Sequence, residues 1–327
     1  MRAFRLSTMC VLAAALAAHA CGSGPSESTA AKRRLSIATG GTGGVFYPYG
    51  GGLAKIISEN IENVEATAEV TAASVDNLKF LKQGTSDIAF TMADTAQDAV
   101  RAEDVFAEFG PVPARTLAVL YASYVHLVTR AGSGIEKVAD LRGRIVSTGA
   151  AGSGTAVLAQ RMLAAAGLNA QRDLRAQSLG AAQSVDALKD GKIDAFFWNG
   201  GLPTAAVLDL VHSPGITASF LSTEDMLPRL QQRHGPLYYR AVIPKATYNM
   251  DADVPVVAVA NLLVVSDTMS ETLAHDITKL LFDRKAELAA IHPQANDLSI
   301  ETALTGSPIQ FHPGAIRYYR ERGVWKE

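Results

Sequence analysis

The sequence predicts an α/β protein built from two related lobes with a cleft between them. Short β-rich runs alternate with helical stretches, and two glycine-rich loops each follow a strand and precede a helix. The order of strand, glycine loop and helix recurs about 110 residues later. In open α/β sheets ligands bind beyond the carboxyl ends of the strands, where such loops lie. The fold class therefore predicts a binding cleft between the two loops.

The first lobe begins with a strand at 34–39, which leads into the glycine-rich stretch 38–52. This stretch holds seven glycines and no charged side chain, a composition that lets a backbone come close to a ligand. The next predicted elements are a helix at 51–61, a strand at 64–72, a helix at 74–84 closed by Gly84, and a strand at 86–92.

The second lobe repeats these events, with a strand at 144–149 and a glycine loop and helix at 150–167. A helix that ends at a glycine before a strand is common in α/β proteins, so a single such match would not indicate a repeat. Four features nevertheless align in one order, which favours two related lobes. The aligned pairs are Thr39-Gly40 with Thr148-Gly149, Ser74-Val75-Asp76 with Ser184-Val185-Asp186, Gly84 with Gly191, and Asp87 with Asp194.

The N-terminus reads as an export signal rather than as part of the fold. Arg2 and Arg5 precede a short apolar run, and residues 18–20 form a small-x-small cleavage site. Residues 1–20 are therefore predicted to be a signal peptide and 21–34 a flexible tether. Cys21 directly after the cleavage site is a candidate for lipidation, with plain cleavage after Ala20 as the alternative. The mature protein is expected in the periplasm.

Composition excludes several classes of protein. The formal net charge is −2 and no basic stripe is present, so nucleic acid is not an expected partner. No cysteine follows Cys21, which excludes a disulfide from the folded domain. No later stretch has the apolar length of a transmembrane helix. With 48% hydrophobic and 19% charged residues, the chain suits a folded domain with a large core.

The glycine loops match no nucleotide-binding or catalytic motif. Neither contains the Gly-Lys-Ser/Thr of a Walker A loop, a complete G-x-G-x-x-G or a G-x-S-x-G nucleophile elbow. The seven histidines are scattered without metal-ligand spacing. We therefore predict no catalytic residue, no metal site and no cofactor, and expect a protein that is not an enzyme.

The remaining candidates form a recognition surface of small and aromatic groups. Ser153, Gly154 and Thr155 offer hydroxyls and N–H donors at a helix start, which suits a carboxylate, although the hydroxyls could equally cap their own helix. Trp198 ends an apolar strand, where it could cover a ligand or pack in the core. The same two alternatives apply to Phe46 and Tyr47.

Two polar residues of the first lobe are further candidates. Asn77 lies in the first turn of its helix and Asp94 follows the third strand, so both could reach the cleft. Neither glycine loop contains a lysine or arginine, so helix N-termini would have to hold an anion unless a distant arginine reaches in. Arg130 and Arg240 are the nearest such arginines.

Five segments together resemble the TAXI family, the extracytoplasmic solute receptors of a subset of TRAP transporters. They are ATGGTGGVFYPYGGGLA, ASVDNLKFLKQGTSDIAF, VADLRGRIVSTGAAGSGTA, GKIDAFFWNGGLPTAA and FHPGAIRYYRERG, in order over residues 36–323. The resemblance implies a two-lobed type II periplasmic binding-protein fold with a ligand cleft between the lobes. It also implies a monomer that delivers its solute to TRAP membrane subunits.

The resemblance also implies site residues and lobe boundaries. The residues that match the family's binding positions are Thr42, Gly43, Gly44, Phe46, Tyr47, Asn77, Asp94, Ser153, Gly154, Thr155, Trp198, Gly201 and Pro203. Small carboxylates such as glutamate, glutamine or 2-oxoglutarate are the ligand class it suggests. Lobe I would comprise 35–122 and 268–327, and lobe II 123–267, with crossing strands at 119–130 and 254–266. The alternative is a sensory binding protein of the same fold that presents its ligand to a receptor or kinase.

Overall fold

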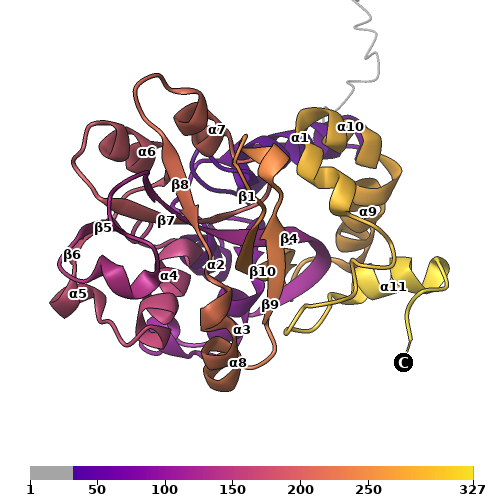
Figure 1. Cartoon of the computed structure of the whole chain (residues 1–327). Coiled ribbons are helices and arrows are strands. Elements are labelled where there is room, and N and C mark those ends of the chain that lie inside the picture. Colours follow the sequence, from indigo (N-terminus) through magenta and orange to yellow (C-terminus); the bar gives the residue numbers. More distant parts are fainter. Residues whose placement is uncertain (1–31, 327) are drawn as a thin grey trace, which may run out of the picture. The chain divides into compact units, whose positions relative to one another are not determined.

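The computed structural model describes residues 32–326, so the predicted signal peptide and Cys21 lie outside the described residues. The described chain contains one mixed sheet of ten strands (Figure 1). The strands are β1 Arg33–Ala38, β2 Val64–Glu69, β3 Ile88–Met92, β4 Ala114–Arg130, β5 Ile145–Ser147, β6 Arg175–Gln177, β7 Ala195–Gly200, β8 Ala218–Leu221, β9 Tyr238–Ile243 and β10 Val254–Ser266.

Helices cover this sheet and join most of its parallel strands. They are α1 Phe46–Asn60, α2 Ser74–Gln83, α3 Ala93–Arg101, α4 Gly154–Ala165, α5 Ala170–Asp173, α6 Ala181–Lys189, α7 Ala205–His212, α8 Leu227–His234, α9 Glu271–Asp283, α10 Lys285–Ile291 and α11 Pro313–Glu321. Short 3-10 helices occupy Asp104–Phe106, Val138–Leu141, Glu224–Met226, Lys245–Thr247 and Pro293–Asp297. None of the described helices is long and apolar enough to cross a bilayer.

Two long antiparallel strands, β4 and β10, join the halves of the sheet. The strand order is β2-β1-β3-β10-β4-β7-β5-β6, with β8 beside β4 and β9 beside β10. The first part of β4 pairs with β10 as far as Tyr124, and from Tyr124 onward β4 pairs with β7. We call β1–β3 with their helices the first half, and β5–β9 with theirs the second half. The lobe boundaries at 122/123 and 267/268 stay a prediction.

The sequence repeat corresponds to a repeat of strand order. β1 pairs in parallel with β2 and β3, and β5 pairs in parallel with β6 and β7. The two aligned aspartates also make the same contact. Asp87 accepts a hydrogen bond from the backbone N–H of Ser36 at 2.9 Å, and Asp194 accepts one from that of Ile145 at 2.7 Å. Each carboxylate thereby ties the start of the third strand to the first strand of its half.

The glycine-rich stretch is shorter as a loop than the sequence predicts, because α1 already begins at Phe46 rather than near Gly51. Its later glycines serve helix packing. A Cβ atom at Gly50 would lie 2.4 Å from Cγ2 of Thr39, and one at Gly52 would lie 2.6 Å from Cδ1 of Ile291. These two glycines therefore let α1 approach β1 and α10 closely.

The N-terminal boundary also differs from the expectation. β1 begins at Arg33, inside the range predicted as tether, and the N–H of Arg33 donates to the carbonyl of Asn63 at 2.8 Å. Pairing with β2 therefore brings the last two residues of that range into the sheet.

Candidate functional site

A cavity of about 340 Å³ lies between the two glycine loops. In the described part of the chain four helices, α1, α2, α4 and α6, begin at its wall. First-turn N–H groups lack intrahelical acceptors, and the macrodipole makes this end of a helix positive. The lining residues are Gly40–Phe46, Val70–Ser74, Met92, Tyr121, Ser123, Ala150, Ser153–Thr155, Gly180–Gln183 and Trp198–Gly200, and no charged side chain is among them.

The two halves touch each other around the cavity. The N–H groups of Val75 and Asp76, in the first turn of α2, donate to the carbonyl of Gly152 at 3.1 and 3.0 Å. On the other side, the N–H of Ala206 donates to the carbonyl of Gly43 at 3.2 Å. The structure is therefore a closed form in which both glycine loops contact the opposite half.

In the second glycine loop the hydroxyls bond mainly to their own half. Ser153 donates to the carbonyl of Ala150 at 2.6 Å and accepts from the N–H of Ala156 at 3.0 Å, so it caps α4. The hydroxyl of Thr155 accepts from the N–H of Asn199 at 3.3 Å. What this loop presents to the cavity is chiefly the first-turn N–H groups of α4, which a carboxylate can use.

Trp198 forms part of the cavity wall and is held from behind by a chain of hydrogen bonds. Its Nε1–H donates to the hydroxyl of Thr204 at 2.9 Å, and the N–H of Thr204 donates to the phenol oxygen of Tyr248 at 2.9 Å. That phenol lies 3.1 Å from Nε2 of His126, whose Nδ1 lies 2.8 Å from the carbonyl of Tyr124. Burial lowers the pKa of His126 to about 4, so the ring is neutral and Nδ1 carries the proton that the carbonyl accepts.

Two buried polar atoms on the cavity wall have no hydrogen-bond partner among the described residues. They are the phenol oxygen of Tyr121 and Oδ1 of Asn199, and both side chains are more than nine-tenths buried. The Asn199 amide nitrogen contacts the sulfur of Met92 at 2.7 Å, so its oxygen is turned away from that contact. Buried polar groups normally have partners, so these two atoms are exceptions among the residues that line the cavity.

The structure brings eight of the predicted site residues together on the cavity wall. They are Thr42, Gly43, Gly44, Phe46, Ser153, Gly154, Thr155 and Trp198. The other five, Tyr47, Asn77, Asp94, Gly201 and Pro203, are not part of the lining. Gly201 lies behind the wall, where a Cβ atom would meet the side chains of Gln294 and Tyr121.

The side chains of Asn77 and Asp94 form hydrogen bonds to other groups of the protein. Asn77 is fully buried, and its amide donates to the carbonyls of Ala38, Thr39 and Phe90 at 3.2, 2.6 and 2.8 Å. Asp94 is equally buried and accepts from the phenol of Tyr238 at 2.7 Å. Neither side chain points into the cavity, because each satisfies buried groups of the fold.

The two arginines that the sequence offers as partners for an anion also bond to other parts of the protein. Arg130 donates to the carbonyls of Leu188 and Lys189, and Arg240 pairs with Glu224 at 2.8 Å. Neither lines the cavity. Helix N-termini and neutral polar groups are therefore what the lining offers an anion. Within residues 32–326, no cluster of His, Cys, Asp and Glu is arranged to hold a metal ion.

Sequence reasoning missed the start of α6, where Gly180 to Gln183 line the cavity. The repeat could have found it, because the SVD of α6 aligns with the SVD of α2, whose start lines the opposite wall. Tyr121 had no such signal, since it lies within the predicted strand at 119–130, whereas Asn199 directly follows Trp198 at the carboxyl end of an apolar strand, the position that predicted Trp198.

Several solved structures of other proteins are similar to this chain. A protein of Bordetella bronchiseptica RB50 is 18% identical, with 88% of this chain and 89% of that chain covered, at a TM-score of 0.51. The binding-protein component of an ABC phosphonate transporter from Pseudomonas aeruginosa is 10% identical, with 80% and 79% covered, at a TM-score of 0.50. The periplasmic aliphatic sulphonate binding protein SsuA from Escherichia coli is 17% identical, with 90% and 94% covered, at a TM-score of 0.44.

At these identities the structural likeness shows the fold, and the family follows from the sequence. The predicted α/β, two-lobed type II periplasmic binding-protein fold is confirmed. The model of the NMT1-like family matches residues 37–323, almost the whole described chain. The protein therefore belongs to the NMT1-like family.

Proposed function

We propose that the protein is an extracytoplasmic solute receptor that encloses a small carboxylate between its two halves. The observation that carries this proposal is the cavity at which four helices begin and which no charged side chain lines. A volume of about 340 Å³ falls within the range of small-molecule sites. A carboxylate at the start of α1, α4 or α6 would gain charge-assisted hydrogen bonds without requiring a counter-ion, whereas the Val75 and Asp76 amides of α2 already donate to Gly152.

The free polar atoms extend this proposal to the rest of the solute. Oδ1 of Asn199 is an acceptor and the phenol of Tyr121 a donor or acceptor, and both residues line the cavity, so a turn of either side chain would offer the solute a second polar contact. Glutamate, glutamine and 2-oxoglutarate each combine a carboxylate with such a group, and this is the class that the TAXI resemblance suggests.

The lining also favours binding over catalysis. It contains no Asp, Glu, His, Lys or Cys. The hydroxyl of Ser153 donates to the backbone carbonyl of Ala150 instead of a side-chain base, and the hydroxyl of Thr155 accepts from the backbone N–H of Asn199. A nucleophile activated by a neighbouring base is therefore not part of the cavity wall. We propose a monomeric, non-enzymatic receptor without a metal or cofactor, whose membrane partners are TRAP subunits.

A thermal-shift panel of organic acids and amino acids tests the proposed function. A solute that binds only the folded state raises Tm. At a concentration one hundred times its Kd, it increases the free energy of unfolding by about 2.7 kcal/mol. The same solute should perturb the emission of Trp198 on the cavity wall, and Trp198→Phe should abolish most of that change. Trp325 packs on Phe311 in the C-terminal segment and should report little. Turnover of a carboxylate by the purified protein, or no shift with any member of the panel, would contradict the proposal.

We further propose that Cys21 carries a lipid that anchors the mature protein in the periplasm. Cys21→Ala is then expected to move the protein from the membrane fraction to the soluble fraction, because the acyl chains supply the membrane affinity. Fractionation followed by immunoblotting checks this. Equal partitioning of both variants would rule out the anchor and leave the cavity untouched.

A further inference from the structure

A buried arginine joins the two halves behind the cavity. Arg161 lies on α4 of the second half and is 7% exposed. Its guanidinium pairs with Asp94 and Asp98 of α3 in the first half, at 3.4 and 2.5 Å, and with Asp104 at 2.6 Å. The phenol of Tyr238 on β9 lies 2.9 Å from the same guanidinium. We call these five residues the Arg161 cluster.

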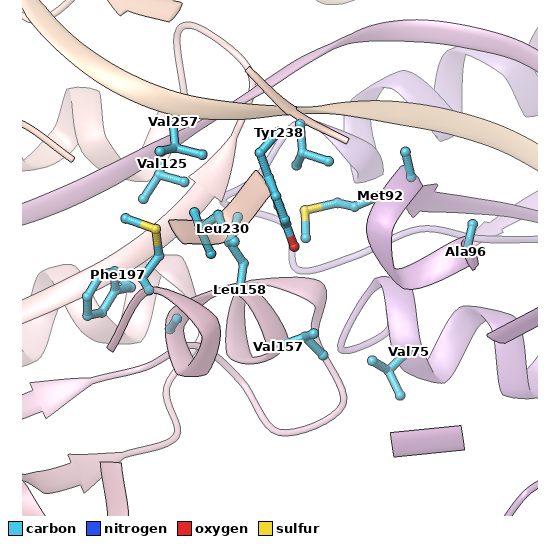
Figure 2. Packing of buried hydrophobic residues seen from close by; sticks show 14 of the residues in the cluster. Val75, Met92, Ala96, Val125, Val157, Leu158, Phe197, Leu230, Tyr238 and Val257 are labelled. Atoms are coloured by element: carbon cyan, nitrogen blue, oxygen red, sulfur yellow. The ribbon is translucent and has the colours of Figure 1, made fainter. Parts of the chain in front are cut away.

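Tyr238 closes the cluster from the second half. Its phenol donates to Asp94 at 2.7 Å and accepts from Arg161, and burial raises its pKa well above 10, so the proton stays on the phenol. Figure 2 shows Tyr238 in one hydrophobic cluster with Met92 of the first half and Leu158 of the second. Arg161, Asp94 and Asp98 therefore lie beside apolar packing that is shared by both halves, whereas the Asp104 side chain is exposed.

The residue that precedes each of the two helices carrying the cluster lines the cavity. α3 starts directly after Met92 and α4 directly after Ser153, and both residues line the cavity. Arg161 follows Gly154 by seven residues, which is about two helical turns and returns to the same face of α4. The cluster thus joins the two helices on the face where the halves meet.

Pairing in this cluster depends on the closed arrangement. Buried carboxylates and guanidinium groups are costly unless they are paired, and Asp94, Asp98 and Tyr238 are each more than nine-tenths buried. If the halves separate, α3 takes Asp94 and Asp98 away from Arg161 and Tyr238. Each separated group must then recover its interactions from water.

We propose that Arg161 is a positioning residue that holds the two sides of the cavity together, so that this cluster sets how readily the protein closes. The inference rests on the proposed function only in that closure is taken to enclose a solute.

Proton binding should modulate this closure. Burial raises the pKa of Asp98 to about 6 against the lowering effect of Arg161, and Asp94 and Asp104 raise it further. Because opening would expose Asp98 to water and return its pKa toward 4, the protonated form favours the closed state. Closure should therefore strengthen as the pH falls from 8 to 5, by up to about tenfold, since each pKa unit is a factor of ten.

Two further groups face the cluster from α8. Arg233 stays charged over this range. Burial lowers the pKa of His234, so protonation of this ring acts against burial, opposite in sign to protonation of Asp98. An Asp98→Asn variant isolates the contribution of Asp98 from these neighbours.

Hydrogen exchange of the Val75 and Asp76 amides reports on closure in the absence of solute. Their amides donate to Gly152 across the cavity, and as first-turn amides of α2 they have no intrahelical acceptor when the halves separate. In Arg161→Met these amides are expected to exchange at least about tenfold faster, while amides in the middle of β4 and β10 keep their protection. Arg130→Met is the matched control, because Arg130, at the end of β4, donates to carbonyls of α6 in the second half.

Two variants keep the test decisive if Arg161→Met disturbs folding. Tyr238→Phe removes only the phenol oxygen and should accelerate exchange at Val75 and Asp76 a few fold. Asp98→Asn should abolish the increase in protection between pH 8 and pH 5. Equal exchange in Tyr238→Phe and the wild type, or an unchanged pH profile in Asp98→Asn, would overturn the proposal. If no solute in the thermal-shift panel binds, the proposed function is contradicted. The hydrogen-exchange result on the Arg161 cluster would still stand.

Discussion

Gly154→Val is expected to weaken solute binding about tenfold to a hundredfold while leaving each half folded. A Cβ atom at Gly154 would lie 2.6 Å from Cε of Met92 and 2.8 Å from Oγ of Ser74, both on the opposite side of the cavity. The larger side chain would therefore hold the halves apart. Overpacking of a close contact costs about 1–3 kcal/mol, which is the origin of this range.

Calorimetric affinity for a solute returned by the thermal-shift panel checks this prediction, with hydrogen exchange at Val75 and Asp76 as a second measure of closure. Gly51→Val is the matched control. Gly51 is exposed on α1 and a Cβ atom there would meet nothing within 4 Å, so affinity should not change. Full affinity in Gly154→Val would show that the halves do not meet at this glycine when solute is bound.

Asn77→Ala is expected to lower the free energy of unfolding by about 3–5 kcal/mol. The Asn77 amide donates to the backbone carbonyls of Ala38 and Thr39 at the end of β1 and of Phe90 within β3, and its oxygen accepts from the hydroxyl of Thr71 at 2.6 Å. Each buried group left without its partner costs about 1–3 kcal/mol. Such a loss is a large fraction of the stability of a typical domain.

Urea denaturation measures this effect, and Asn199→Ala provides the comparison. The oxygen of Asn199 has no protein partner, so its removal should cost about 1 kcal/mol or less and should instead weaken solute binding. A stable Asn77→Ala variant that had lost affinity would reverse these roles and return Asn77 to the binding site.

The helix boundaries of the first half show which features the local sequence pattern predicts and which it does not. The helix at 74–84 ends as predicted, because Gly84 adopts a left-handed φ of 71°, which a side chain disfavours. The start of α1 was placed wrongly, since seven glycines indicate a loop when they are read without their neighbours. Gly50 and Gly52 lie within α1 at positions where Thr39 and Ile291 leave no room for a Cβ atom, and nothing in the local sequence reveals these partners.

The candidate site divides in the same way. Glycine loops at the carboxyl ends of strands predict a cavity wall from sequence, and both loops line the cavity. The role of a single buried polar residue is different, because it depends on a partner far along the chain. Asp94 is 67 residues from Arg161 and 144 from Tyr238, and only the packing of the two halves brings them together.

The sequence by itself determined the alternation of strands and helices, the repeat and the position of both glycine loops. These features follow from hydrophobic periodicity and turn chemistry, which act over a few residues. Only the tertiary structure decided that Asn77 and Asp94 stabilise the fold while Tyr121 and Asn199 face the cavity. Periodicity indicates which side of an element is buried, but a buried side chain contacts whichever element the sheet order places against it, and that order is set by packing between distant segments.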